Sequence, residues 1–167
     1  MGLVVGFLAV SLLQATELIK YLTGRPLPAK VDPLHQVRGW KDIARMIQSE
    51  RQTLLTEGKP VFLITDHYGT AGILSFYLPE ARTNVADQPL VYCVRSLRPQ
   101  NQSYFWPGYQ DRKGQDAIYI RENDTPVTPP ATLLTDFRSV SFLGAREAYY
   151  DGRPFRRYEL FLYRDVR

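Results

Sequence analysis

The sequence is poor in the residues that build metal centres and covalent crosslinks. Its 167 residues include one cysteine, Cys93, and two histidines, His35 and His67. A single cysteine excludes an intrachain disulfide and any metal site built from several cysteine ligands. The two histidines lie in different segments without the spacing of a ligand pair, so we expect no metal ion and no other cofactor.

The signatures of common catalysts are also missing. No segment matches a phosphate-binding glycine loop or a dinucleotide fingerprint, and no serine lies in a nucleophile elbow. Cys93 lies in the middle of an expected strand, where an inert buried thiol is commoner than a nucleophile. We therefore name no catalytic residue. A soluble hydrolase-like α/β enzyme is a weaker alternative, because the chain offers no paired nucleophile and base.

The charge balance is mildly basic. The chain carries 21 basic and 17 acidic residues, a net charge of +4. The excess is spread along the chain except at Arg153, Arg156 and Arg157, whereas nucleic-acid binding usually needs a basic stripe on one face. We therefore expect no nucleic-acid partner. Anionic lipid headgroups, a phosphorylated ligand and a plain solvated surface all fit this charge.

The first 16 residues carry no charge, and the run from Leu3 to Leu13 is almost continuously apolar. A helix that is apolar on every side needs a deep core or lipid. We expect a transmembrane-like helix over residues 1–23, the end of a span that begins upstream in a longer protein. A signal peptide, which would want a basic start, and a buried helix of a soluble protein are the alternatives.

A proline-rich linker is expected over residues 24–36. Gly24 can end the preceding helix, and Pro26 and Pro28 cannot continue it. Residues 37–167 would then form the soluble domain.

The pattern of apolar residues in this domain predicts alternating helices and strands. Helical spacing runs from Trp40 to about Thr56 and again over residues 70–77. The dipeptide Asp151-Gly152 between two strand-like runs indicates a hairpin. Strands are expected over residues 61–64, 90–94, 117–120, 140–148 and 155–164, with a short helix over residues 131–137. We expect an α/β fold, a small three-layer domain with a mostly parallel sheet and a C-terminal antiparallel hairpin.

Polar side chains follow each strand of the expected parallel sheet. Asp66 and Tyr68 follow the first strand, Arg95 the second and Arg121 the third. Ligands of open parallel sheets bind outside the carboxyl ends of the strands. These four side chains could hold a polyhydroxylated or phosphorylated ligand. Alternatively, Asp66 caps the helix that begins near Thr70, Tyr68 packs in the core and the arginines are solvated.

The loop from Tyr104 to Tyr109 is rich in aromatic residues and supplies a fifth candidate, Trp106. Its ring could stack on a sugar, lie at a lipid interface or pack in the core.

Several short motifs resemble the soluble C-terminal domain of bacterial membrane glycosyltransferases of family 39, the dolichyl-phosphate-mannose-protein mannosyltransferase-like group. This group is similar to the aminoarabinose transferases that decorate lipid A. The resemblance covers roughly residues 1–125. Its motifs are Asp32-Pro33, Arg38-Gly39-Trp40, Asp66-x-Tyr68, Phe76-Tyr77-Leu78-Pro79 and Tyr104 to Trp106.

The resemblance implies an accessory domain of an enzyme that uses a polyprenyl-phosphate-linked sugar as donor. In that family the catalytic acidic residues lie in an early extracytoplasmic loop, which has no counterpart here, so we expect a fragment that does not transfer sugar alone. Its partners would be membrane lipid and the donor or an acceptor glycan. It would lie at the inner (cytoplasmic) membrane with its soluble domain on the periplasmic or extracytoplasmic side. The alternative is a membrane-anchored, non-catalytic binding or scaffold module.

Overall fold

The computed structural model describes residues 2–14, 16–25, 31–32, 34, 37–83, 87–94, 102–122, 128–150 and 152–167. Five α-helices, two 3-10 helices and five strands follow one another along these residues. In chain order they are α1 (Gly2–Gln14), α2 (Thr16–Thr23), α3 (Trp40–Leu55), β1 (Val61–Thr65), α4 (Tyr68–Tyr77), η2 (Pro79–Arg82), β2 (Val91–Cys93), η3 (Gln102–Phe105), β3 (Asp116–Glu122), α5 (Ala131–Leu134), β4 (Phe137–Tyr150) and β5 (Arg153–Val166).

The N-terminal apolar segment forms two helices, α1 and α2, instead of the single helix that the sequence predicts for residues 1–23. The described side chains of α1 are exposed, among them Leu3 at 90% and Phe7 at 72%. None of the helices in the described parts of the chain has both the length and the apolar character to traverse a bilayer. The prediction of a transmembrane-like helix is therefore not supported.

The helix expected from Trp40 onwards is confirmed as α3. Its apolar residues recur every three or four positions, so Trp40, Ile43 and Ile47 fall on one face and are buried. Gly39 precedes the helix with a φ of 73°, a left-handed conformation that glycine adopts without strain. The periodicity of the sequence thus fixes both the start of α3 and its buried face.

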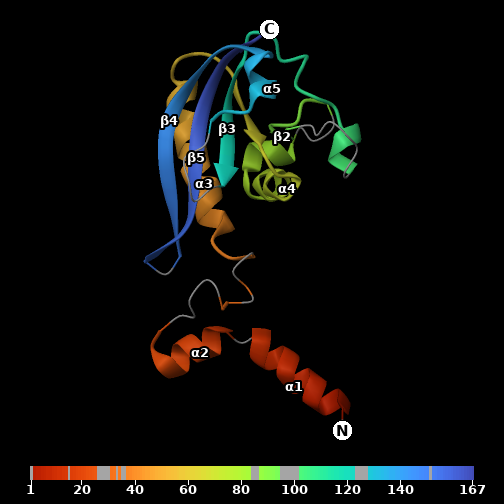
Figure 1. The fold of residues 1–167 in the computed structure, drawn as a ribbon, viewed down its shortest axis with the longest axis vertical. Helices are drawn as coiled ribbons and strands as arrows, with labels where there is room; N and C mark the ends of the chain where they lie inside the picture. Colours follow the sequence, from red (N-terminus) through yellow and green to blue (C-terminus); the bar gives the residue numbers. More distant parts are fainter. Residues whose placement is uncertain are drawn as a thin grey trace.

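The five strands form one sheet in the order β2-β1-β3-β5-β4 (Figure 1). β1 pairs in parallel with β2 and β3, whereas β5 pairs antiparallel with both β3 and β4. The C-terminal hairpin is confirmed, but the expectation of a mostly parallel sheet is wrong. β4 and β5 have 14 residues each, while the three parallel strands have 3, 5 and 7, so antiparallel pairing dominates a mixed sheet.

Helices α3 and α4 cover one face of the sheet. They contact each other, and both contact β1, so they cannot lie on opposite faces. The other face carries α5, which contacts β4, and an aromatic cluster around Phe62 that includes Tyr109 and Phe137. Figure 1 shows α3 behind the sheet and α5 in front of it. The core therefore lies on both faces of the short parallel strands.

The segment before α3 is fastened to the far end of the β4–β5 hairpin. Asp32 forms an ion pair with Arg38 at 3.2 Å, and Arg38 donates a hydrogen bond of 2.5 Å to the hydroxyl of Tyr150. Beside them, the guanidinium of Arg156 lies 4.5 Å from the centre of the Trp40 ring. Two motifs that suggested the family resemblance thus have a structural role in this joint.

Candidate functional site

The carboxyl edge of the parallel strands brings together two of the predicted site residues. Asp66 directly follows β1, Arg121 lies near the end of β3, and β1 pairs with β3 in parallel. The Nε atom of Arg121 is 3.8 Å from Oδ2 of Asp66, and each side chain is about one-third exposed. This pair therefore offers solvent a carboxylate and a guanidinium side by side.

Burial raises the pKa of Asp66, and this effect exceeds the opposing attraction of Arg121. The attraction of Arg121 thus does not fully offset the free-energy cost of burying the ionised carboxylate. A partly buried carboxylate of this kind is a strong hydrogen-bond acceptor for a ligand hydroxyl.

Two further ionisable groups lie close to this pair. Burial raises the pKa of the Tyr119 phenol well above its usual range, and the negative charge of Asp66 adds to the effect. Burial also raises the pKa of the Cys93 thiol, and the negative charge of Asp66 raises it further. At neutral pH both groups are therefore protonated, so Cys93 is a thiol and not a nucleophilic thiolate.

Tyr68 does not join the Asp66–Arg121 pair in the described structure. Tyr68 is half-exposed at the start of α4, with its ring centroid 4.4 Å from that of His67. Arg95 lies outside the described residues. The alternative role for Asp66 as a helix cap is wrong, because Nδ1 of His67 accepts the capping hydrogen bond from the backbone of Gly69 at 3.1 Å.

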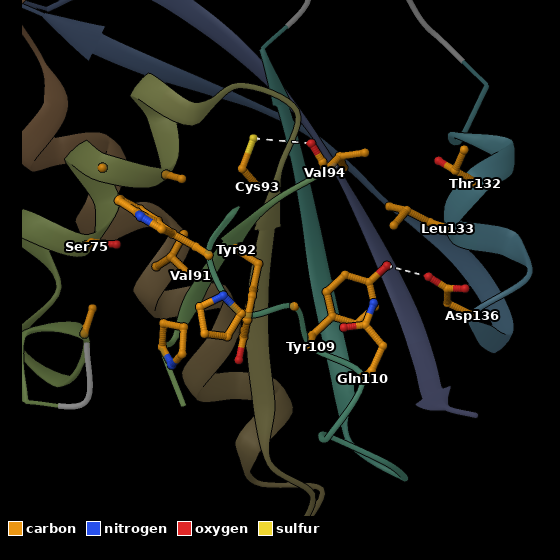
Figure 2. A pocket seen from close by; sticks show the side chains of 17 residues that line it. Ser75, Val91, Tyr92, Cys93, Val94, Tyr109, Gln110, Thr132, Leu133 and Asp136 are labelled. Carbon is orange, nitrogen blue, oxygen red and sulfur yellow. Dashed lines mark hydrogen bonds between the residues drawn. The ribbon is translucent and has the colours of Figure 1, made fainter. Parts of the chain in front are cut away.

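A cavity of about 690 Å³ lies along β2, the strand at one edge of the sheet. It is lined on one side by small residues of α4, Ala71, Gly72 and Ser75, and on the other by Tyr109, Leu133 and their neighbours. Figure 2 shows Ser75 on one side of the edge strand and Tyr109, Leu133 and Asp136 on the other. This volume is typical of a site for a small molecule or a short segment of a chain.

The cavity wall is mostly apolar with a few polar groups. Trp106, a predicted contact residue, lines it with 56% of its surface exposed. Ser75, Gln110 and Thr132 supply hydroxyl and amide groups, and the hydroxyl of Tyr109 donates a hydrogen bond of 2.7 Å to Asp136. An apolar wall with few polar groups suits an uncharged ligand that carries its own hydrogen-bonding atoms.

Arg112 holds the wall of the cavity in place from behind. Its buried guanidinium donates to the Tyr92 hydroxyl at 2.8 Å, to Gln115 and to the backbone carbonyls of Gln88 and Pro89. It also lies 5.1 Å from the centre of the Phe62 ring. A polar loop sequence around Arg112 gives no signal of this role, so sequence analysis missed it. Ser75, Tyr92 and Asp136 were missed for the same reason, because only the tertiary fold brings them together.

The described residues contain no group of three or more metal-ligating side chains. The chain matches no protein-family model, no curated protein and no solved structure.

Proposed function

We propose that this chain is the C-terminal accessory domain of a membrane glycosyltransferase that takes its sugar from a polyprenyl phosphate. The observation that carries the proposal is the Asp66–Arg121 pair at the carboxyl edge of the parallel strands. A carboxylate accepts hydrogen bonds from sugar hydroxyls, and a guanidinium binds phosphate oxygens through several donors. The pair therefore has the chemistry to contact a sugar phosphate or its hydroxylated acceptor.

The N-terminal helices support attachment to a membrane. The exposed side chains of α1 include Leu3, Val4 and Val5, three consecutive residues that point in different directions around the helix. Such a surface is costly in water and favourable in lipid. In α2, Lys20 and Tyr21 are residue types that collect at the membrane interface. Under this proposal the α/β domain lies on the periplasmic or extracytoplasmic side of the inner membrane.

The proposal is tested on the full chain in lipid nanodiscs. The probe is a short-chain polyprenyl phosphate carrying mannose, with free mannose and the unglycosylated polyprenyl phosphate as separate arms. We expect Arg121→Gln and Asp66→Asn to weaken binding of the sugar phosphate at least tenfold. The matched control is Arg138→Gln, because Arg138 is exposed on β4. Equal affinity of all variants, or no binding of any probe, would reject the proposed contact.

A second candidate function is a non-catalytic binding module anchored to the membrane, and the cavity along β2 favours it. The coding sequence immediately upstream separates the two candidates. Several further apolar spans with an acidic loop support the transferase, whereas an in-frame stop codon just before the first codon supports the module.

A further inference from the structure

The cavity along β2 contains backbone groups that have no partner in the part of the chain that the structure describes. In the parallel pair with β1, the carbonyl of Leu90 accepts from Leu63 at 2.9 Å, and the N–H of Val94 donates to Thr65 at 2.8 Å. Each residue of a strand directs its N–H and C=O groups to the same side, and the next residue directs its own groups to the opposite side. Leu90, Tyr92 and Val94 therefore face β1, and Val91 and Cys93 face the free edge.

The N–H and C=O groups of Val91 and Cys93 have no hydrogen-bond partner among the described residues. Both residues line the cavity, whose described lining includes all of β2 and none of β1. Val91 is 7% exposed and Cys93 is half-buried, so these groups are at least partly sheltered from solvent. Buried backbone groups are nearly always paired, so a ligand that fills this cavity must supply partners for them.

We infer that the cavity binds an uncharged polypeptide segment in extended conformation, which adds to the sheet as a strand beside β2. An extended peptide repeats its N–H and C=O groups every two residues, the same repeat that separates Val91 from Cys93. An isoprenoid or acyl chain would fill the apolar space but leave these groups without partners. The edge chemistry therefore favours a peptide over a lipid chain.

The two walls of the cavity match the side chains of such a strand. Successive side chains of an added strand point alternately to the two faces of the sheet. On one face they meet Ala71, Gly72 and Ser75, which are small and leave room for bulk. On the other face they meet Tyr109 and Leu133. The Asp136 carboxylate already accepts a hydrogen bond from Tyr109, so a peptide with uncharged side chains fits this wall.

Hydrogen exchange of individual amides gives a direct test on the full chain in detergent micelles. The probe is a blocked heptapeptide of alternating valine and threonine with a glutamine at each end, so it carries no charge. We expect a saturating amount to slow exchange of the Val91 and Cys93 amides at least tenfold. The Tyr92 amide is the internal control, because it faces β1 and should not change. No added protection at Val91 and Cys93 overturns the inference.

Two N-methylated peptides show whether the contact is made by backbone. One peptide is methylated on the amides of its odd-numbered residues and the other on the amides of its even-numbered residues, so each has one edge blocked. We expect one to lose at least tenfold in affinity and the other to bind like the parent, because only one edge of the peptide faces β2. Equal affinities of the two methylated peptides would overturn the inference. Farnesol is the competing probe, and its binding without that of the peptide assigns the cavity to an isoprenoid.

A variant that fills the cavity completes the test. A Cβ atom at Gly72 meets nothing within 4 Å, so Gly72→Trp can place its ring in the cavity without a clash at the helix. We expect it to abolish peptide binding, while Gln52→Trp, exposed on α3, leaves binding unchanged. A folded Gly72→Trp variant that binds peptide normally overturns the inference. Arg121→Gln should leave peptide binding intact, so this inference and the proposed sugar contact fail independently.

Discussion

The guanidinium of Arg121 lies 3.8 Å from the carboxylate of Asp66 and ties the end of β3 to the residue after β1. Because burial outweighs this attraction, the pKa of Asp66 is higher in the folded chain than in the unfolded one. The ionised carboxylate therefore lowers the stability of the fold at neutral pH.

Asp66→Asn should raise the free energy of unfolding at pH 7. The full gain in the free energy of unfolding should be present at pH values above the raised pKa of Asp66 in the folded protein. It should shrink as the pH falls through that value and vanish below the unfolded pKa of about 3.9, where both proteins carry a neutral side chain. Urea denaturation at pH 7 and pH 3 measures the difference. Asp111→Asn, at an exposed position before β3, should change stability by less than about 0.5 kcal/mol. Destabilisation by Asp66→Asn at pH 7 would mean that the attraction of Arg121 prevails.

Tyr163→Phe should stabilise the protein by about 1 kcal/mol. The side chain is fully buried, and its hydroxyl has no hydrogen-bond partner in the described structure. Burial also raises the pKa of Tyr163 to about 12. Removing an unsatisfied polar atom recovers its cost of desolvation. The matched change Tyr109→Phe should destabilise by about 1 kcal/mol, because it removes the hydrogen bond to Asp136. The same direction of change in both variants would contradict this account.

Cys93 should react slowly with iodoacetamide at pH 8, because burial and Asp66 raise the pKa of its thiol above the usual value of about 8.5. The rate should rise about tenfold per pH unit below that pKa, since only the thiolate reacts. Asp66→Asn should speed the reaction. Mass spectrometry follows it without ambiguity, because Cys93 is the only cysteine. The urea-unfolded chain serves as the reference, and an equally fast folded protein would exclude the raised pKa.

Arg112→Met should destabilise the fold by at least about 3 kcal/mol. The substitution removes the donors to the part-buried carbonyls of Gln88 and Pro89, and it leaves the buried Tyr92 hydroxyl without its partner. Thermal and urea unfolding measure the loss. Lys113→Met, at the exposed neighbouring position, should change stability by less than about 0.5 kcal/mol. A small effect of Arg112→Met would show that the guanidinium is replaceable.

Local patterns in the sequence predict most individual elements. The helical period from Trp40 predicts α3, and Asp151-Gly152 predicts the hairpin of β4 and β5. The position of β5 beside β3 is not predictable in this way, because it depends on pairs such as Ala117 with Tyr163, which are distant in sequence. The balance between parallel and antiparallel pairing follows from those contacts, and for this reason the sheet type was predicted wrongly.

The candidate site is predicted only in part for a similar reason. The rule for carboxyl ends of parallel strands identifies Asp66 and Arg121, and the structure places them together. The aromatic loop identifies Trp106 as a candidate contact residue, and Trp106 lines the cavity. Ser75 and Asp136 belong to segments whose meeting depends on β2 being the edge strand, which no local pattern shows.

The hydrogen bond from Arg38 to Tyr150 joins residues 112 positions apart. During synthesis Arg38 leaves the ribosome long before Tyr150 has been made, so the joint between the N-terminal segment and the domain cannot close early. Helices α1 and α2 can thus form before this joint exists. The joint at Arg38 then closes once Tyr150 has been made and the hairpin of β4 and β5 forms.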